Sequence, residues 1–316
     1  MSTSPQATDA LDLVSNLQSR FVSGLEKVSA TFGHDVTFTK SEWLRDSGTH
    51  GGGNRYSAPA GGIFNRASVN VSQIHYDDLP EKKLGSATAL STIIHPANPH
   101  APSVHIHISW TEMKGGTGYW RIMADLNPSV VHPKYRDQFS QCLQDAAPEQ
   151  YEEAAEQGDR YFYIPALNRH RGVTHFYLES YHSDNPVTDR NLAHAFGEAV
   201  IVRYLEILSK ALHTYPAASE ADQAAQLAYH TLYLFQVLTL DRGTTSGLLV
   251  HDQNDLGIMG SLPSHIDRDL LASWADKVEG TQTELVHELT AALPEGTRIE
   301  ITDHIKQALA KTVRKH

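Results

Sequence analysis

The sequence has a single cysteine, Cys142, so it cannot form an internal disulfide, and this is typical of proteins in a reducing cytoplasm. No apolar run approaches the roughly 20 residues of a membrane span, and the polar first ten residues do not have the pattern of a signal peptide. Lys and Arg number 26 against 37 Asp and Glu, and the net charge of -11 argues against nucleic acid as the main partner. We therefore expect a cytoplasmic globular protein that acts on neither a membrane nor a nucleic acid.

Signatures of several common enzyme classes are also absent. The glycine-rich residues 50–55 do not continue as a dinucleotide-binding or Walker-type phosphate loop. We expect this stretch to be either a flexible turn or a loop that contacts a ligand. The sequence contains neither a G-x-S-x-G nor an H-E-x-x-H motif, and Cys142 lies in a predicted helix without a neighbouring base, which favours a structural role.

The most informative stretch is a predicted β-hairpin over residues 91–128. Alternation along its first strand places His105, His107 and Ser109 on one face, with isoleucines on the other. A glycine-rich turn follows, and the returning strand ends at Asp125. One hairpin thus carries two imidazoles, a hydroxyl and a carboxylate, and we expect the chemistry to occur there.

The remaining pattern predicts an α+β fold with an antiparallel sheet. Residues 1–9 are expected to be disordered, and apolar residues at helical spacing predict a helix over residues 10–31. Most strand candidates precede the long helices, predicted over residues 191–214, 220–240, 270–292 and 301–313, with a short strand over 248–250. We find no repeat or linker, so residues 10–316 are predicted to form a single domain.

The hairpin side chains allow more than one chemistry. His105 and His107 face the same way and could share a metal with Glu112, whereas the alternative is that His105 donates a proton or a hydrogen bond in a pocket. Asp125 could act as a general base or bind an N–H group, or it could only cap a turn.

Two arginines precede glycines, in Arg171-Gly172 and Arg242-Gly243. An arginine beside a permissive backbone suits the binding of a carboxylate, and a surface salt bridge is the alternative.

Several segments together resemble the oxygen-dependent coproporphyrinogen III oxidase family. They occur in the order of the family from about residue 50 to about residue 265. They are GGG at 51–53, GIF at 62–64, ASVN at 67–70, HPANPHAP at 95–102, DL at 125–126, RG at 171–172, DRGT at 241–244 and SLP at 261–263.

The resemblance implies a large, flat antiparallel sheet sandwiched between helices, usually in a homodimer. It implies an oxidoreductase of heme biosynthesis that uses dioxygen to convert two propionate side chains of coproporphyrinogen III into vinyl groups, with no organic cofactor and no essential metal. Asp125 would then hold the pyrrole N–H groups and help to remove a proton, His105 would donate a proton, and Ser91 would contact the substrate.

The sequence also departs from the family. His107 and Ser109 stand where the family has an asparagine and an arginine, so they join Ser91, Arg171 and Arg242 as candidates for substrate binding. The loss of positive charge is expected to weaken binding of a tetracarboxylate by several kcal/mol. The alternative function is therefore a cofactor-independent oxidative decarboxylation of a smaller carboxylic acid in secondary metabolism. A tetrapyrrole-binding protein without activity and a metal oxygenase using His105 and His107 are further hypotheses.

Overall fold

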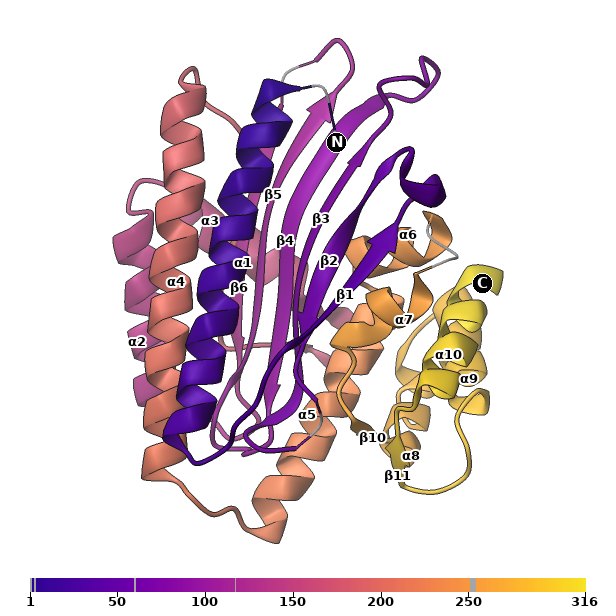
Figure 1. Cartoon of the computed structure of the whole chain (residues 1–316). Coiled ribbons are helices and arrows are strands. Elements are labelled where there is room, and N and C mark those ends of the chain that lie inside the picture. The colour runs from indigo at the N-terminus through magenta and orange to yellow at the C-terminus, as the bar shows by residue number, and fades with distance from the viewer. Residues whose placement is uncertain (1, 3, 60, 117, 251–253) are drawn as a thin grey trace.

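The computed structural model describes residues 1–316 except 1, 3, 60, 117 and 251–253 (Figure 1). Among the described residues, one large sheet has the strand order β1-β2-β3-β4-β5-β6-β9, and every neighbouring pair is antiparallel. The predicted α+β class with an antiparallel sheet is confirmed. Its strands are β1 Thr39–Leu44, β2 Gly51–Ser57, β3 Phe64–His75, β4 Leu84–Pro96, β5 Ser103–Met113, β6 Tyr119–Asn127 and β9 Thr174–Tyr181.

Helices lie on both sides of this sheet (Figure 1). The helices are α1 Pro5–Thr31, α2 Pro133–Ala146, α3 Tyr151–Phe162, α4 Pro186–Thr214, α5 Glu220–Thr239, α6 Arg242–Val250, α7 Asp255–Ile258, α8 Arg268–Ala272, α9 Thr281–Ala291 and α10 Asp303–Lys315. Two short ribbons complete the described fold, β7 Tyr163–Ile164 with β8 Arg169–His170 and β10 His265–Asp267 with β11 Arg298–Glu300.

One face of the sheet is apolar and packs against α1, α2 and α4. Ile106 and Ile108 of β5 are fully buried in this layer, together with Leu17 of α1 and Phe196 of α4. Gly197 allows α4 to approach closely, because a Cβ atom there would lie 2.7 Å from Cδ1 of Ile108. Burial of this face supplies the main hydrophobic stabilisation of the sheet.

The opposite face of the sheet carries polar side chains and is covered by the C-terminal helices. These helices bury their own apolar residues in a second core, for example Phe235 of α5 and Leu289 of α9. His105 and His107 lie on this second face, because β5 alternates as predicted. The fold thus encloses a polar sheet surface between two apolar cores.

Three predicted elements differ from the structure. The first helix begins at Pro5, inside the segment predicted to be disordered, because Ser4 caps it and also donates a hydrogen bond to Glu112. The residues predicted as a strand over 248–250 belong to α6. The helix predicted over 270–292 is split into α8 and α9 by a short 3-10 turn at Ala275–Lys277.

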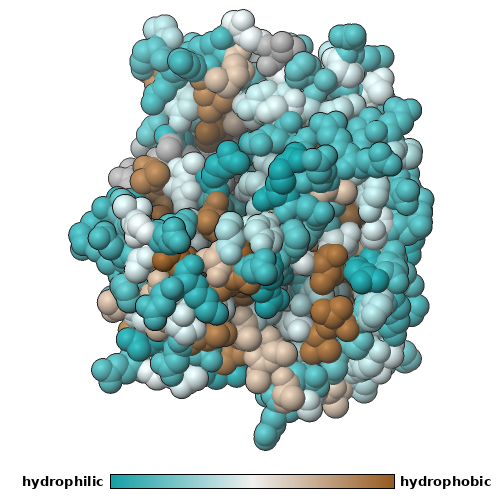
Figure 2. Space-filling model, turned by 180° about the vertical axis from the view of Figure 1, so that it is seen from behind, coloured by the Kyte–Doolittle hydropathy of each residue, from teal (hydrophilic) through white to brown (hydrophobic). Residues whose placement is uncertain are grey.

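Within the described part of the chain, no helix combines the length and apolarity that crossing a bilayer demands. Figure 2 shows the molecule from behind, where hydrophilic residues dominate and hydrophobic residues gather only in small groups.

Candidate active site

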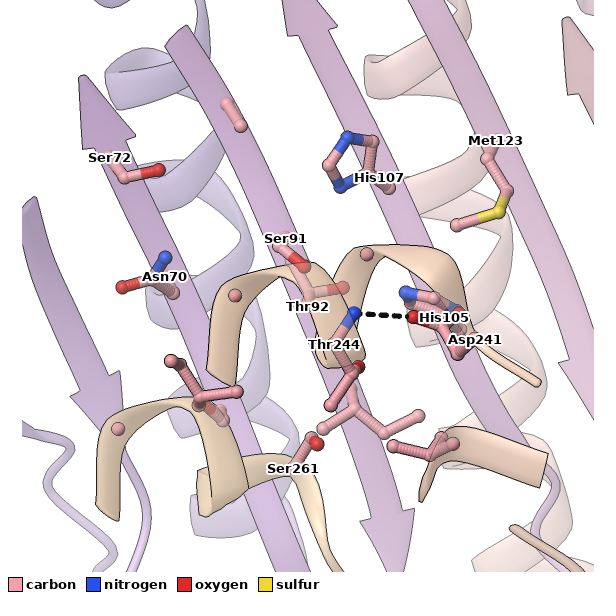
Figure 3. Close-up of a pocket in the computed structure, with 18 of the residues that line it drawn as sticks. Asn70, Ser72, Ser91, Thr92, His105, His107, Met123, Asp241, Thr244 and Ser261 are labelled. Atoms are coloured by element: carbon pink, nitrogen blue, oxygen red, sulfur yellow. Dashed lines mark hydrogen bonds between the residues drawn. The ribbon is translucent and has the colours of Figure 1, made fainter. Parts of the chain in front are cut away.

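A cavity of about 300 Å³ lies between the polar face of the sheet and the segment from α5 to α7 (Figure 3). Its floor is formed by residues of β1 to β6 and β9, and its cover by residues of α5, α6 and α7. The floor includes Arg55, Asn70, Ser72, Ser91, His105, His107, Arg121, Met123 and Tyr177, and the cover includes Tyr233, Asp241, Thr244, Asn254 and Ser261. This volume is at the lower end of the range of about 300–1,000 Å³ for small-molecule pockets.

The predicted hairpin supplies much of this floor. Ser91, His105 and His107 all line the cavity, as expected for substrate-contacting or catalytic residues. Ser109 is buried, and its hydroxyl lies 3.0 Å from Nε2 of His107, so it orients that imidazole instead of lining the cavity.

Asp125 lies directly opposite His105 in the β5–β6 register, so both side chains are on the same face of the sheet. Asp125 is fully buried, however, and it does not line the cavity. Its Oδ2 accepts hydrogen bonds from Arg171 at 2.6 and 3.1 Å, and its Oδ1 lies 2.7 Å from Nδ1 of His175. Asp125 therefore does not face the cavity beside His105, because both of its oxygens are already engaged, and its predicted catalytic role stays a prediction.

Arg171 is the centre of a buried network. Its Nη1 donates to Gln236 at 2.6 Å, and its Nη2 lies 3.1 Å from Nδ1 of His105. Burial alone would raise the pKa of Asp125, but the charge of Arg171 and the bond to His175 hold it well below its usual range. Arg171 therefore neutralises Asp125, and its predicted place as a substrate contact is not supported, because it does not line the cavity.

Gly172 allows this arrangement. A Cβ atom there would lie 2.3 Å from Oδ1 of Asp125 and 2.6 Å from the carbonyl oxygen of Leu126. The Arg-Gly pair thus meets a carboxylate, as the sequence suggested, but the carboxylate belongs to the protein.

The contact with Arg171 fixes the protonation of His105. A guanidinium only donates hydrogen bonds, so Nδ1 of His105 accepts and the neutral ring carries its proton on Nε2. Burial, and then the charge of Arg171, lower the pKa of His105 to about 4. Burial and the charge of Arg121 lower the pKa of His107 to about 3. Both imidazoles are therefore neutral near pH 7.

The carboxylate that lines the cavity is Asp241, at the junction of α5 and α6. Its Oδ1 accepts a 2.7 Å hydrogen bond from the backbone N–H of Thr244 (Figure 3). Its Oδ2 accepts one at 3.0 Å from the hydroxyl of Tyr161. Burial alone would raise its pKa, but the bond from Thr244 and the nearby charges lower it, so Asp241 is ionised at neutral pH. Asp241 and His105 thus form a carboxylate and imidazole pair within one cavity.

Two arginines that were not selected from the sequence, Arg55 and Arg121, line the cavity. Arg55 of β2 is half-buried and has no acidic partner among the residues that the structure describes, and burial lowers its pKa. Arg121 of β6 lies 3.3 Å from Glu179. A half-buried arginine without a counter-ion is a strong candidate for binding a carboxylate. Its place in the glycine-rich stretch at residues 50–55 was the only signal for Arg55.

Arg242, the other predicted arginine, is exposed and does not line the cavity, whereas its neighbours Gly243 and Thr244 do. Nor can Glu112 complete a metal site with His105 and His107. It lies on the opposite face of β5, where it accepts hydrogen bonds from Ser4 and Ser86. Metal binding by His105 and His107 alone stays a prediction.

Comparison with known proteins gives a consistent result. A family model described as coproporphyrinogen III oxidase matches residues 10–292. The chain is 26% identical over 291 residues to an oxygen-dependent coproporphyrinogen-III oxidase of Prochlorococcus marinus (strain MIT 9301), covering 80% of this chain and 82% of that protein. It is 27% identical over 318 residues to the Drosophila melanogaster enzyme of the same name, covering 93% of this chain and 76% of that protein. A mitochondrial enzyme of that name from Rattus norvegicus is 27% identical over 251 residues, covering 72% of this chain and 56% of that protein.

The buried pair of Asp125 and Arg171 predicts a strong coupling in stability. Arg171→Met leaves a buried carboxylate and Asp125→Asn leaves a buried guanidinium, and each change is expected to cost about 3–5 kcal/mol of unfolding free energy. The double variant should cost less than the sum of the two, as measured by urea unfolding.

The same pair predicts a dependence on pH. Because the folded-state pKa of Asp125 is depressed, its contribution is present above the unfolded pKa of about 3.9 and is lost as the pH falls further. The Asp125→Asn, Arg171→Met double variant should lose less unfolding free energy than the wild type between about pH 5 and about pH 2. Additivity of the single changes within about 0.5 kcal/mol would contradict the coupling.

Proposed function

The chain belongs to the coproporphyrinogen III oxidase family, and we propose that it catalyses the oxygen-dependent oxidative decarboxylation of coproporphyrinogen III in porphyrin and heme biosynthesis. The observation that carries this proposal is the pairing of Asp241 and His105 in a cavity whose floor also holds Ser91 and Arg55. Membership of the family supplies the substrate and the reaction.

The reaction balances without a further redox partner. Each propionate side chain loses its carboxyl group as carbon dioxide and one hydrogen from the carbon next to the pyrrole ring, and a vinyl group remains. Dioxygen takes up the two electrons and two protons and leaves as hydrogen peroxide. The protein therefore has to hold the carboxylates, move protons and admit dioxygen.

We assign the contact with the pyrrole N–H groups to Asp241 in place of Asp125. Its ionised carboxylate lies in the cavity, whereas Asp125 is neutralised behind the cavity by Arg171 and His175. A carboxylate accepts N–H hydrogen bonds and can take up a proton as a general base. Thr244 and Tyr161 hold it in place by donating to its two oxygens.

His105 is proposed to act through its Nε2–H group. Arg171 holds the opposite nitrogen, so Nε2 can donate a hydrogen bond to a substrate carboxylate or to reduced oxygen. Asp125 thus acts as a positioning residue, because it holds the Arg171 guanidinium that orients His105.

The positions of the polar side chains support a wide substrate. Arg55 on β2 lies level with His107 on β5, three strand spacings or about 14 Å away, and His105 is two residues further along β5. One carboxylate could bind Arg55 while another reacts beside His105, and this separation favours the tetrapyrrole over a small acid.

We also propose that the protein is a homodimer, as the family resemblance implies. Leu44 of β1 and Leu249 of α6 expose 60% and 64% of their surface, so each could be covered by a partner. Light scattering is expected to give a mass of about twice the 35.0 kDa of the chain. A mass of one chain at micromolar concentration would contradict this proposal.

A cytoplasmic location is the companion proposal, supported by the single cysteine. Recovery of the native protein from another compartment after cell fractionation would contradict it.

Asp241 offers the most direct test of the mechanism. Purified wild-type protein is expected to convert coproporphyrinogen III to vinyl products under air and not under nitrogen, as resolved by liquid chromatography. Asp241→Asn should lower kcat by a factor of about 10²–10⁴, because it removes the cavity base. The exposed Asp276→Asn serves as a matched control. Absence of vinyl product from wild-type protein under air would refute the substrate, and full activity of Asp241→Asn would refute the role of Asp241.

Arg55 tests the binding of the substrate carboxylates. Arg55→Gln should lower kcat/KM by about 10- to 100-fold, mainly through KM, because a hydrogen bond between charged groups contributes about 1.5–3 kcal/mol. The control is Arg20→Gln, at an exposed site on α1. An unchanged KM would show that Arg55 does not bind the substrate.

A further inference from the structure

A second cluster of chemically active side chains lies outside the cavity. Asp159 comes from α3, His170 from β8 and His175 from β9, and their potential ligand atoms all lie within 4.8 Å of one another. None of the three lines the cavity. We propose that these residues bind one divalent transition-metal ion of the zinc class, as a structural site at the edge of the sheet.

His175 is oriented as a metal ligand is. Its Nδ1 donates to the fully buried Asp125 at 2.7 Å, because a carboxylate can only accept. Histidines that bind metals almost always donate their other ring N–H to a carboxylate or carbonyl in this way. Nε2 of His175 lies 3.9 Å from Oδ1 of Asp159, so it faces the cluster.

Helix α3 also holds His175 in place through two of its residues. Phe162 stacks on it with the centroids 5.0 Å apart and an interplanar angle of 26°. Gly158 lets α3 cross directly above it, since a Cβ atom there would lie 2.6 Å from Cβ of His175. Asp159 is the next residue, and this close crossing brings its carboxylate to the imidazole.

The other two ligands can close around an ion. The Asp159 side chain is 66% exposed, so it can rotate and the ion can enter from solvent. His170 and His175 have ring centroids 5.3 Å apart. Ligands of a tetrahedral zinc site are about 3.3 Å apart, so closure needs side-chain shifts of about 1.5 Å or less. His170 would exchange its 3.1 Å bond to the backbone oxygen of Asp159 for the metal.

The charges and donor atoms suit such an ion. Two imidazole nitrogens and one carboxylate oxygen are typical zinc ligands, and water can take the fourth position. The nearby Arg171 does not oppose the cation, because Asp125 lies bonded to both Arg171 and His175 and neutralises the guanidinium. The bound ion would join α3, β8 and β9 and hold His175 on Asp125.

Cobalt provides a test that does not depend on turnover. Full-length protein freed of metal with a chelator and titrated with Co²⁺ is expected to bind one ion per chain with a visible absorption band, which Zn²⁺ displaces. Asp159→Asn and His170→Gln should each weaken binding at least about tenfold, since even loss of an outer-shell partner costs 10–100-fold. His182→Gln, at an exposed histidine outside the cluster, should bind as the wild type does.

The outcomes separate metal binding from a purely structural role. Both ligand variants lie toward the surface, and their urea unfolding curves report whether they fold. If His170 only caps the last carbonyls of α3, wild-type protein will show no cobalt band, and the proposal is wrong. An equal band in wild type and both ligand variants would overturn it too. Failure of coproporphyrinogen turnover would leave this result unaffected.

Discussion

The buried ion pair between Asp125 and Arg171 is the constraint on which the candidate site depends. The two side chains are fully buried, so each charge is tolerated only because the other is present. Through Arg171 the pair reaches His105 on β5 and Gln236 on α5, and through Asp125 it reaches His175 on β9. One network therefore fixes the positions of both layers around the cavity.

This network explains how a polar surface can exist inside the protein. The sheet buries aliphatic side chains on the face toward α1 and α4, and this burial supplies hydrophobic stabilisation that does not depend on the polar face. The second face can then carry imidazoles, hydroxyls and arginines, provided that they are hydrogen-bonded or face the cavity. The lowered pKa values of His105 and His107 follow from that enclosure, because burial penalises the charged imidazole.

The departures of this chain from its family can be understood in the same terms. Where the resemblance led us to expect additional arginines, the structure instead has Arg55 at the far side of the cavity floor. His175 lies behind the cavity, where it both supports Asp125 and faces the proposed metal cluster. Asp125 thus supports the proposed substrate site through Arg171 and the proposed metal site through His175, and it lines neither the cavity nor the metal cluster.

The sequence by itself determined the antiparallel α+β fold, the family and the face of β5 that carries His105 and His107, because these depend on local periodicity and on motifs in order. It also indicated that Arg171-Gly172 meets a carboxylate. Only the tertiary structure decided which carboxylate this is, and that Asp241 rather than Asp125 faces the cavity. Such contacts join residues more than 40 positions apart, such as Arg171 and Asp125, and side chains from different elements compete for them. The strength of each pairing depends on burial, which no local pattern of residues records.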